Sequence, residues 1–184
     1  MRGTIIGTVA LVLLIAPAIF ALPAAGAPDS TERIWIVGTG ILCGLAPSAC
    51  PDISMASNGD TIEISGEGTF QPHPKSVTGG GTFVHKDGDG AVLATGTWTA
   101  TKLMSFHTFG TDAFDSTTIE GGVLKMHVVL MPSGGSGVPA ILTVFCLVGP
   151  DVPAGLEEGI ALNVQGPLNF KEIVSGLTVY IPTS

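Results

Sequence analysis

Hydrophobic and polar residues alternate with a period of two along most of this chain, and this alternation constrains the fold more than any other feature. The alternating segments are rich in β-branched and aromatic residues, and turn signals such as NGD, DGDG and SGGSGVP separate them. Successive side chains of a strand point to opposite faces, so the pattern is typical of half-buried strands. We expect strands at 33–37, 60–65, 81–86, 91–100, 123–131, 140–148, 160–164 and 177–181.

Short strands at this spacing predict an all-β fold, and the two architectures that fit are a small antiparallel β-barrel of about eight strands and a two-layer β-sandwich. The positions of the glycines help to choose between the barrel and the sandwich. Gly66, Gly68, Gly96 and the run 79–81 lie within or beside expected strands. Glycine in a strand marks a bulge, a sharp bend or a close approach of two backbones, which a barrel requires at its corners. We therefore favour the barrel.

The first 27 residues have the features of a signal peptide. Arg2 gives a positive start, a long apolar run follows, and Ala25-Gly26-Ala27 supplies the small residues that a signal peptidase accepts. We expect secretion to the extracellular space, with a mature chain that begins at Pro28. No later segment has the roughly 20 continuous apolar residues that span a bilayer, so we expect no membrane contact after cleavage.

We expect the mature chain to form a single domain, since its length is that of one ordinary domain. The segment 28–59 holds the first strand and the Cys43/Cys50 loop, and 60–184 holds the body of the barrel. The chain is acidic, with a formal net charge of −8 at pH 7. Its few basic residues form no stripe, which argues against nucleic acid as a partner.

Three cysteines follow the leader, namely Cys43, Cys50 and Cys146. An odd number in an oxidising compartment predicts one disulfide and one remaining thiol, or a bridge between two chains of a homodimer. We favour a long-range bridge to Cys146, because that residue lies in a strand-like segment and would close a much longer loop. The pair Cys43 and Cys50 remains the alternative.

The stretch GGGTFVHKDGDG at 79–90 resembles both a phosphate-binding loop and a calcium loop, and its context fits neither. The glycines run into a strand, whereas a phosphate cradle leads into a helix. Counted from Asp87, the twelfth residue is Trp98, where a calcium loop has glutamate. The stretch is better explained as a β-hairpin with DGDG at its tip.

A hairpin that is symmetric about DGDG places His85 opposite Val92 and predicts one apolar face. This face would hold Phe83, His85, Val92, Ala94, Gly96 and Trp98. We take Phe83, His85, Val92 and Trp98 as a candidate ligand pocket, with His85 at the mouth of the barrel as its one ionisable group. The outer face would be mostly threonine.

We expect neither a metal nor a cofactor, because the four histidines have no ligand spacing and no Cys-x-x-Cys pair is present. Catalytic motifs are equally scarce. The GGSG at 134–137 is followed by Val138 and so departs from the G-x-S-x-G elbow. An enzymatic function is therefore the weaker hypothesis.

The succession NGDTIEISGEGTF, TGGGTFVHKD and GTWTA resembles a group of small secreted all-β proteins without an assigned activity. At the level of the fold, the pattern is also similar to barrels such as dirigent proteins, allene oxide cyclases and lipocalins. That resemblance implies a fold that hosts both binding proteins and enzymes.

Our leading hypothesis is a secreted barrel that binds a small apolar ligand or a surface partner. A cyclase-like or isomerase-like enzyme, in which His85 or a buried carboxylate moves a proton, is the first alternative. A structural or adhesive cell-wall protein is the second.

Overall fold

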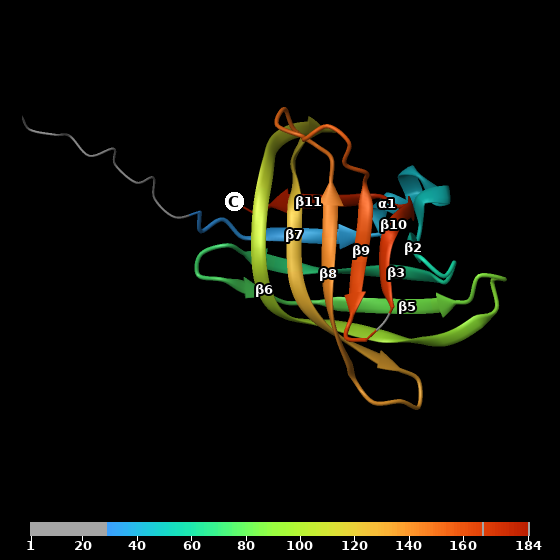
Figure 1. Cartoon of the computed structure of the whole chain (residues 1–184). Coiled ribbons are helices and arrows are strands. Elements are labelled where there is room, and N and C mark those ends of the chain that lie inside the picture. The colour runs from blue at the N-terminus through green and yellow to red at the C-terminus, as the bar shows by residue number, and fades with distance from the viewer. Residues whose placement is uncertain (1–28, 167, 184) are drawn as a thin grey trace, which may run out of the picture.

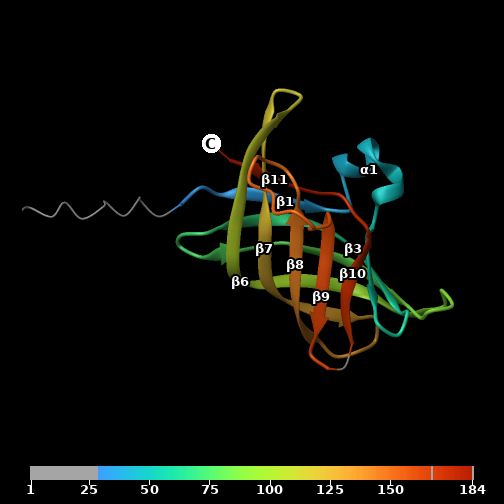
Figure 2. The same ribbon diagram turned by 45° about the horizontal axis from the view of Figure 1, so that its top comes forward.

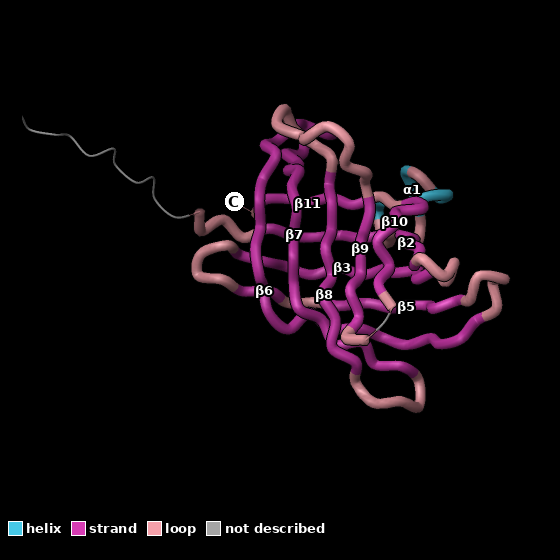
Figure 3. The backbone as a smooth tube through the Cα atoms, in the orientation of Figure 1, coloured by secondary structure: helices cyan, strands magenta, loops and turns pink. Residues whose placement is uncertain are grey.

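The computed structural model describes residues 29–183 with the exception of residue 167, and nearly all of its regular structure is β-strand (Figures 1 and 3). The predicted signal peptide and its cleavage site lie outside the described residues. The strands are β1 (Arg33–Val37), β2 (Asp52–Ala56), β3 (Thr61–Gln71), β4 (Ser76–Val77), β5 (Gly80–Lys86), β6 (Val92–Phe114), β7 (Thr117–Pro132), β8 (Val138–Cys146), β9 (Gly159–Val164), β10 (Asn169–Ser175) and β11 (Thr178–Pro182). A five-residue helix, α1 (Ile41–Leu45), and a 3₁₀ turn at Pro47–Ala49 connect β1 to β2. No helix in the described part of the chain is long and apolar enough to cross a membrane.

The strands form one antiparallel sheet that closes on itself, as the sequence predicted. The closed ring has eight strands, in the order β2, β3, β5, β6, β7, β8, β9 and β10, and β10 pairs with β2. β1 and β11 pair with each other and bridge β3 to β7. In Figure 1, β7, β8 and β9 run across β1, β3 and β5, and β6 bends from one layer into the other. Three irregularities in its pairing with β7 accompany this bend, as expected of β-bulges.

Side chains fill the interior of the ring. Its aromatic members are Trp35, Phe70, Phe83, Trp98, Phe170 and Tyr180, and aliphatic residues of β3, β7, β8 and β9 pack around them. An eight-stranded ring has an interior just wide enough to be filled in this way.

The two tryptophans explain the unusual glycines. Trp35 and Trp98 stack with their ring centroids 5.4 Å apart. A Cβ atom added at Gly66 would lie 2.7 Å from the Trp98 ring, and one added at Gly68 would lie 2.7 Å from the Trp35 ring. Gly79 is equally close to Trp35. Real Cβ atoms do not approach other atoms so closely, so the glycines of β3 and of the segment before β5 form a seat for the two indoles.

The seat also satisfies the polar atoms of the indoles. Trp98 Nε1 donates to the carbonyl oxygen of Ser65 at 3.1 Å, and Trp35 Nε1 donates to that of Thr78 at 3.2 Å. Buried indole N–H groups need such partners. The glycine run 79–81 therefore has a packing role, in agreement with the rejection of a phosphate loop.

The hairpin around DGDG forms as predicted, but the partners in β6 are shifted by two residues along the strand and by one residue next to the tip. Phe83 pairs with Gly96 and His85 with Ala94, whereas a bulge lies between His85 and Lys86, so that Lys86 pairs with Val92. The predicted pairing of His85 with Val92 is therefore wrong. The bulge turns Val92 out to solvent, where 57% of it is exposed.

Several elements were not predicted from the sequence. Neither the strands β2, β4 and β10 nor the helix α1 was expected, and the strand expected at 91–100 continues in the structure to Phe114. The segment 111–122 forms the tip of the β6–β7 hairpin, with Asp115 and Ser116 at positive φ in the turn. Positive φ at both central residues gives a turn whose twist matches that of the flanking strands.

Trp98→Ala should lower the free energy of unfolding by about 3–5 kcal/mol, because it removes a wholly buried ring and leaves a cavity over the glycine seat. Urea titration followed by circular dichroism measures the loss. Leu93→Ala, on the exposed outer face of the same strand, is the control and should change stability little. Equal losses in both variants would contradict the assigned role of the indole stack.

Candidate functional site

The structure places the four residues of the predicted pocket in different surroundings. Phe83 and Trp98 belong to the packed core, and Val92 lies outside the ring. His85 shares the inner face with Phe83, as predicted, and its Nε2 lies 3.0 Å from Asp60 Oδ2. Its ring also meets Phe170 edge to face. His85 is thus engaged by structural contacts at the end of the ring.

An apolar groove lies on the outside of the ring instead, where α1 and the tip of the β6–β7 hairpin project from the same side of the molecule (Figure 2). Its volume is about 720 Å³, within the range of small-molecule sites. The lining residues are Ile41, Leu42, Gly44, Leu45, Phe114, Asp115, Thr117, Ile119, Val148, Glu158, Leu177, Thr178, Val179 and Ile181.

The groove follows from the alternation of β1 and β11. Tyr180 points into the ring core, while Val179 on β11 packs outside the ring with Ile36 of β1 and Leu42 of α1. Ile119, Leu177 and Ile181 extend this second, smaller core. Sequence reasoning assigned only one apolar face to these strands. The signal that could have revealed the second was the near-continuous apolar run RIWIV, which is typical of a strand buried on both faces.

Large apolar side chains remain uncovered along the rim of the groove. Ile41 and Leu45 are 59% and 56% exposed, and Phe114 at the hairpin end is about half exposed. Exposed apolar side chains that gather around a concavity mark a binding surface, unlike those scattered singly.

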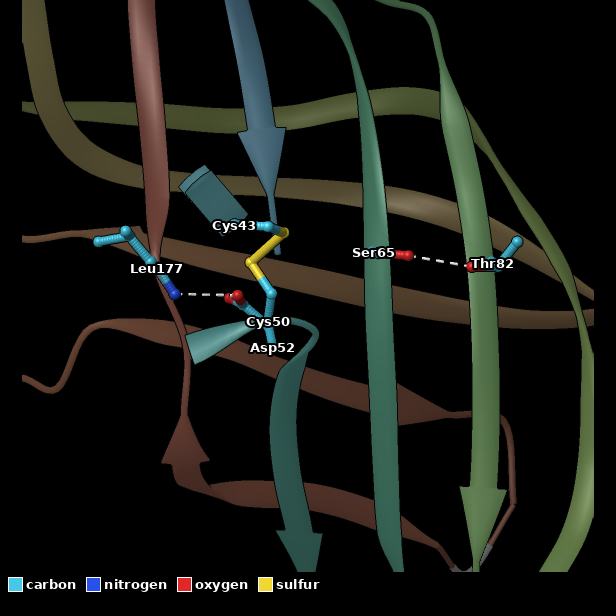
Figure 4. Close-up of a disulfide and its surroundings, with 6 residues drawn as sticks. All are labelled: Cys43, Cys50, Asp52, Ser65, Thr82 and Leu177. Carbon is cyan, nitrogen blue, oxygen red and sulfur yellow. Dashed lines mark hydrogen bonds between the residues drawn. A yellow bond between two sulfur atoms is a disulfide. The ribbon is translucent and has the colours of Figure 1, made fainter. Parts of the chain in front are cut away.

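A disulfide between Cys43 and Cys50 fixes α1 beside the groove (Figure 4). The helix has five residues and no side-chain cap, so it is far too short to be stable alone. Cys50 packs against the second core, and the bridge therefore ties the helix to the sheet. The expected long-range bridge to Cys146 is wrong, because Cys146 lies within the ring core with its thiol wholly buried.

Two carboxyl groups lie where β11 begins, and one of them, Glu158, lines the groove. Asp52 Oδ1 accepts the N–H of Leu177 at 3.0 Å, as Figure 4 shows. Glu158 Oε1 accepts the N–H of Thr178 at 2.9 Å, and Glu158 Oε2 accepts that of Leu147 at 2.7 Å. The two acids thus bind consecutive amides, that of the residue before β11 and that of the first residue of β11.

Burial raises the pKa of Asp52 to about 8. The nearby Glu158 also raises this pKa, whereas the hydrogen bond from the backbone N–H of Leu177 lowers it. Among the described residues, Asp52 Oδ2 has no hydrogen-bond partner. Gly159 and Gly176 border this oxygen, and a Cβ atom at Gly176 would lie 2.7 Å from it. The backbone therefore closes tightly around a carboxyl group that is neutral at pH 7.

Burial also raises the pKa of Glu158. Thr178 Oγ1 lies 2.8 Å from the Phe145 carbonyl oxygen and 3.0 Å from Glu158 Oε1. A hydroxyl has one proton, and a carbonyl oxygen can only accept. The Thr178 hydroxyl can donate its single proton to the Phe145 carbonyl. Its contact with Glu158 Oε1 is then also a hydrogen bond if Glu158 carries a proton and donates it to the hydroxyl, which agrees with the raised pKa of Glu158. Glu158 is therefore a carboxyl group with a raised pKa that lines an apolar groove.

No group of three potential metal ligands lies together in the described ranges 29–166 and 168–183. No protein family, curated protein or solved structure matches this chain in the comparisons with known proteins.

The cysteine pairing predicts a simple labelling pattern. Iodoacetamide should leave the folded protein unmodified and add once per chain in denaturant, because burial holds Cys146 inaccessible and raises its pKa to about 12. Peptide mapping should find Cys43 joined to Cys50. A mapped bridge that includes Cys146, or its rapid labelling in the folded protein, would contradict this pattern.

Stability should fall as the pH rises from about 4 to about 8, because folded Asp52 keeps a proton that the unfolded chain has lost. One such group contributes a slope of at most about 1.4 kcal/mol per pH unit. Asp52→Asn should reduce this slope and stabilise the protein at pH 8. Thermal or urea unfolding at a series of pH values tests this, with Asp89→Asn in the exposed hairpin turn as the control. An unchanged slope in Asp52→Asn would contradict the assignment.

Proposed function

We propose that this chain is a secreted binding protein that holds a small apolar ligand in the groove between α1, β11 and the β6–β7 hairpin tip. The observation that supports this proposal is the clustering of exposed Ile41, Leu45 and Phe114 around a concavity of ligand size. Water contact with these side chains is unfavourable by roughly 25 cal/mol for each Å² of apolar surface, so a ligand that covers them gains affinity.

The support for a ligand outside the ring is also geometric. The core residues of the ring interior, Phe83 and Trp98 among them, are packed against one another. The groove, in contrast, lies between elements that are held in place before any ligand arrives. The Cys43–Cys50 bridge fixes one wall, and β11 forms the floor through its pairing with β1. A preformed site loses less conformational entropy on binding.

A catalytic function of the isomerase type is a second candidate, favoured by the raised pKa of Glu158 at the groove. A carboxyl group with a raised pKa is suited to move a proton at neutral pH. His85, the other proton carrier considered from the sequence, does not line the groove. Hydrogen–deuterium exchange at the α-carbon of an added apolar ketone, followed by NMR, would favour catalysis if the exchange required Glu158.

Binding of the uncharged fluorescent probe N-phenyl-1-naphthylamine tests the groove. Leu45→Asp should weaken binding at least tenfold, because it places a charge on an exposed rim position that folding does not depend on. Leu93→Asp is a matched control, since Leu93 is 55% exposed and does not line the groove. Fluorescence titration gives both affinities. Wild-type affinity in Leu45→Asp, or an equal loss in Leu93→Asp, would refute the proposal.

A further inference from the structure

The ionisable residues of the groove are all acids. Of its lining residues, Asp115 lies at the rim and Glu158 at the inner end, and no lysine, arginine or histidine is among them. Asp52 is a third carboxyl group close to Glu158, near enough for Glu158 to raise the pKa of Asp52. The groove therefore has an apolar body and an acidic inner end.

This arrangement disfavours the commonest natural amphiphiles. An anionic head group, such as a carboxylate or a phosphate, would find no cation in the groove and would face Glu158 and Asp115. An unpaired charge in a partly desolvated site is costly. The formal net charge of −8 for the whole chain adds to this repulsion.

One carboxylate oxygen of Glu158 can accept a further hydrogen bond. Its Oε1 contacts both the N–H and the hydroxyl of Thr178, whereas Oε2 accepts only the N–H of Leu147 among the described residues. A carboxylate oxygen can accept a second hydrogen bond. A donor that enters the groove at this end can therefore bind Oε2 without displacing a contact of the protein.

We propose that the ligand is an amphiphilic amine, whose apolar body lies between α1 and the hairpin tip and whose ammonium group pairs with the Glu158 carboxylate. This inference rests on the function proposed above and adds the head group of the ligand. An ammonium group supplies both the positive charge and the N–H donors that the acidic end lacks.

Binding is coupled to a proton. Burial raises the pKa of Glu158, and a proton on this group would complete its hydrogen bonds with Thr178 and the Phe145 carbonyl. When the ammonium group binds, the O–H bond of Glu158 breaks, the proton leaves to solvent, and the carboxylate pairs with the cation. The charge of the site is unchanged by this exchange, since one cation replaces one proton. Affinity for the amine should consequently rise with pH through the range in which Glu158 ionises.

Other groups around Glu158 do not supply a competing cation. The titratable groups that face it are Asp52 from β2, Cys146 from β8 and Tyr180 from β11. All three are acids, which cannot carry a positive charge, and burial raises the pKa of each. Asp115 faces the groove from the hairpin turn.

Three probes with the same chain length separate the head group from the apolar body. Dodecylamine, dodecan-1-ol and dodecanoate, each below its micellar concentration, compete with N-phenyl-1-naphthylamine for the purified protein at pH 7. We expect dodecylamine to displace the fluorescent probe at a concentration at least tenfold lower than either of the others. Calorimetry in buffers with different ionisation enthalpies should detect proton release on binding of dodecylamine and none on binding of dodecan-1-ol.

Two substitutions locate the effect. Glu158→Gln should abolish the tenfold preference and the proton release, whereas Glu67→Gln, the same substitution at an exposed position of β3, should leave both unchanged. If Glu158→Gln does not fold, the comparison of the three probes and the proton release in the wild-type protein decide the question alone.

The outcomes distinguish this inference from the proposal on which it rests. Equal displacement by dodecylamine and dodecan-1-ol, with binding still weakened by Leu45→Asp, would refute the amine head group and leave the apolar groove intact. Tighter binding of dodecanoate would refute it as well. Both proposals would be refuted if none of the three probes displaced N-phenyl-1-naphthylamine, or if Leu45→Asp left the displacement unchanged.

Discussion

The stacking of Trp35 on Trp98 over a seat of glycines is the interaction on which the rest of this structure depends. The stack brings together β1, β3, β6 and the segment that enters β5, and it requires glycine where any Cβ atom would collide with an indole. With Trp35 held inside, alternation along β1 places Ile36 on the outside, where it packs against Val179 and Leu42. The position of the groove floor is thus a consequence of how the ring interior is packed.

A second constraint acts where β11 begins. The amides of Leu177 and Thr178 would be left without partners at the end of the β1–β11 pairing, and two carboxyl groups accept them. Burial disfavours the charged form of a carboxyl group, and it raises the pKa of both acids. The same groups that complete the backbone hydrogen bonding therefore give this end of the groove its acid chemistry. Glu158 both accepts backbone hydrogen bonds and lines the groove. A substitution of Glu158 can therefore affect folding as well as binding, and the head-group selectivity of the wild-type protein provides independent evidence.

Small barrels are commonly expected to bind ligands inside, and this chain illustrates why closure alone does not predict that outcome. Eight strands enclose little space, and large aromatic side chains occupy it here. Elements added to the outside of the ring create the concave surface instead. A five-residue helix held by a disulfide and a hairpin that extends beyond its neighbouring strands stand on either side of β11. Both additions interrupt the regular pattern of the sheet.

The sequence by itself determined the fold class, because the period-two alternation and the glycine-rich turns are local properties that fix strands and their faces. It located β1 at its observed bounds and identified Phe83, His85 and Trp98 as one inner face. It could not determine how His85 is placed relative to Val92, because a single bulge reverses the face of every residue beyond it. Nor could it choose Cys50 over Cys146 as the partner of Cys43, because the choice depends on which thiol the ring interior encloses. The groove joins residues 41–45, 114–119 and 177–181, and the acid pair joins Asp52 to Glu158. Only the tertiary structure could bring these distant segments together, since their contacts arise from the closure of the sheet and from no pattern within any one segment.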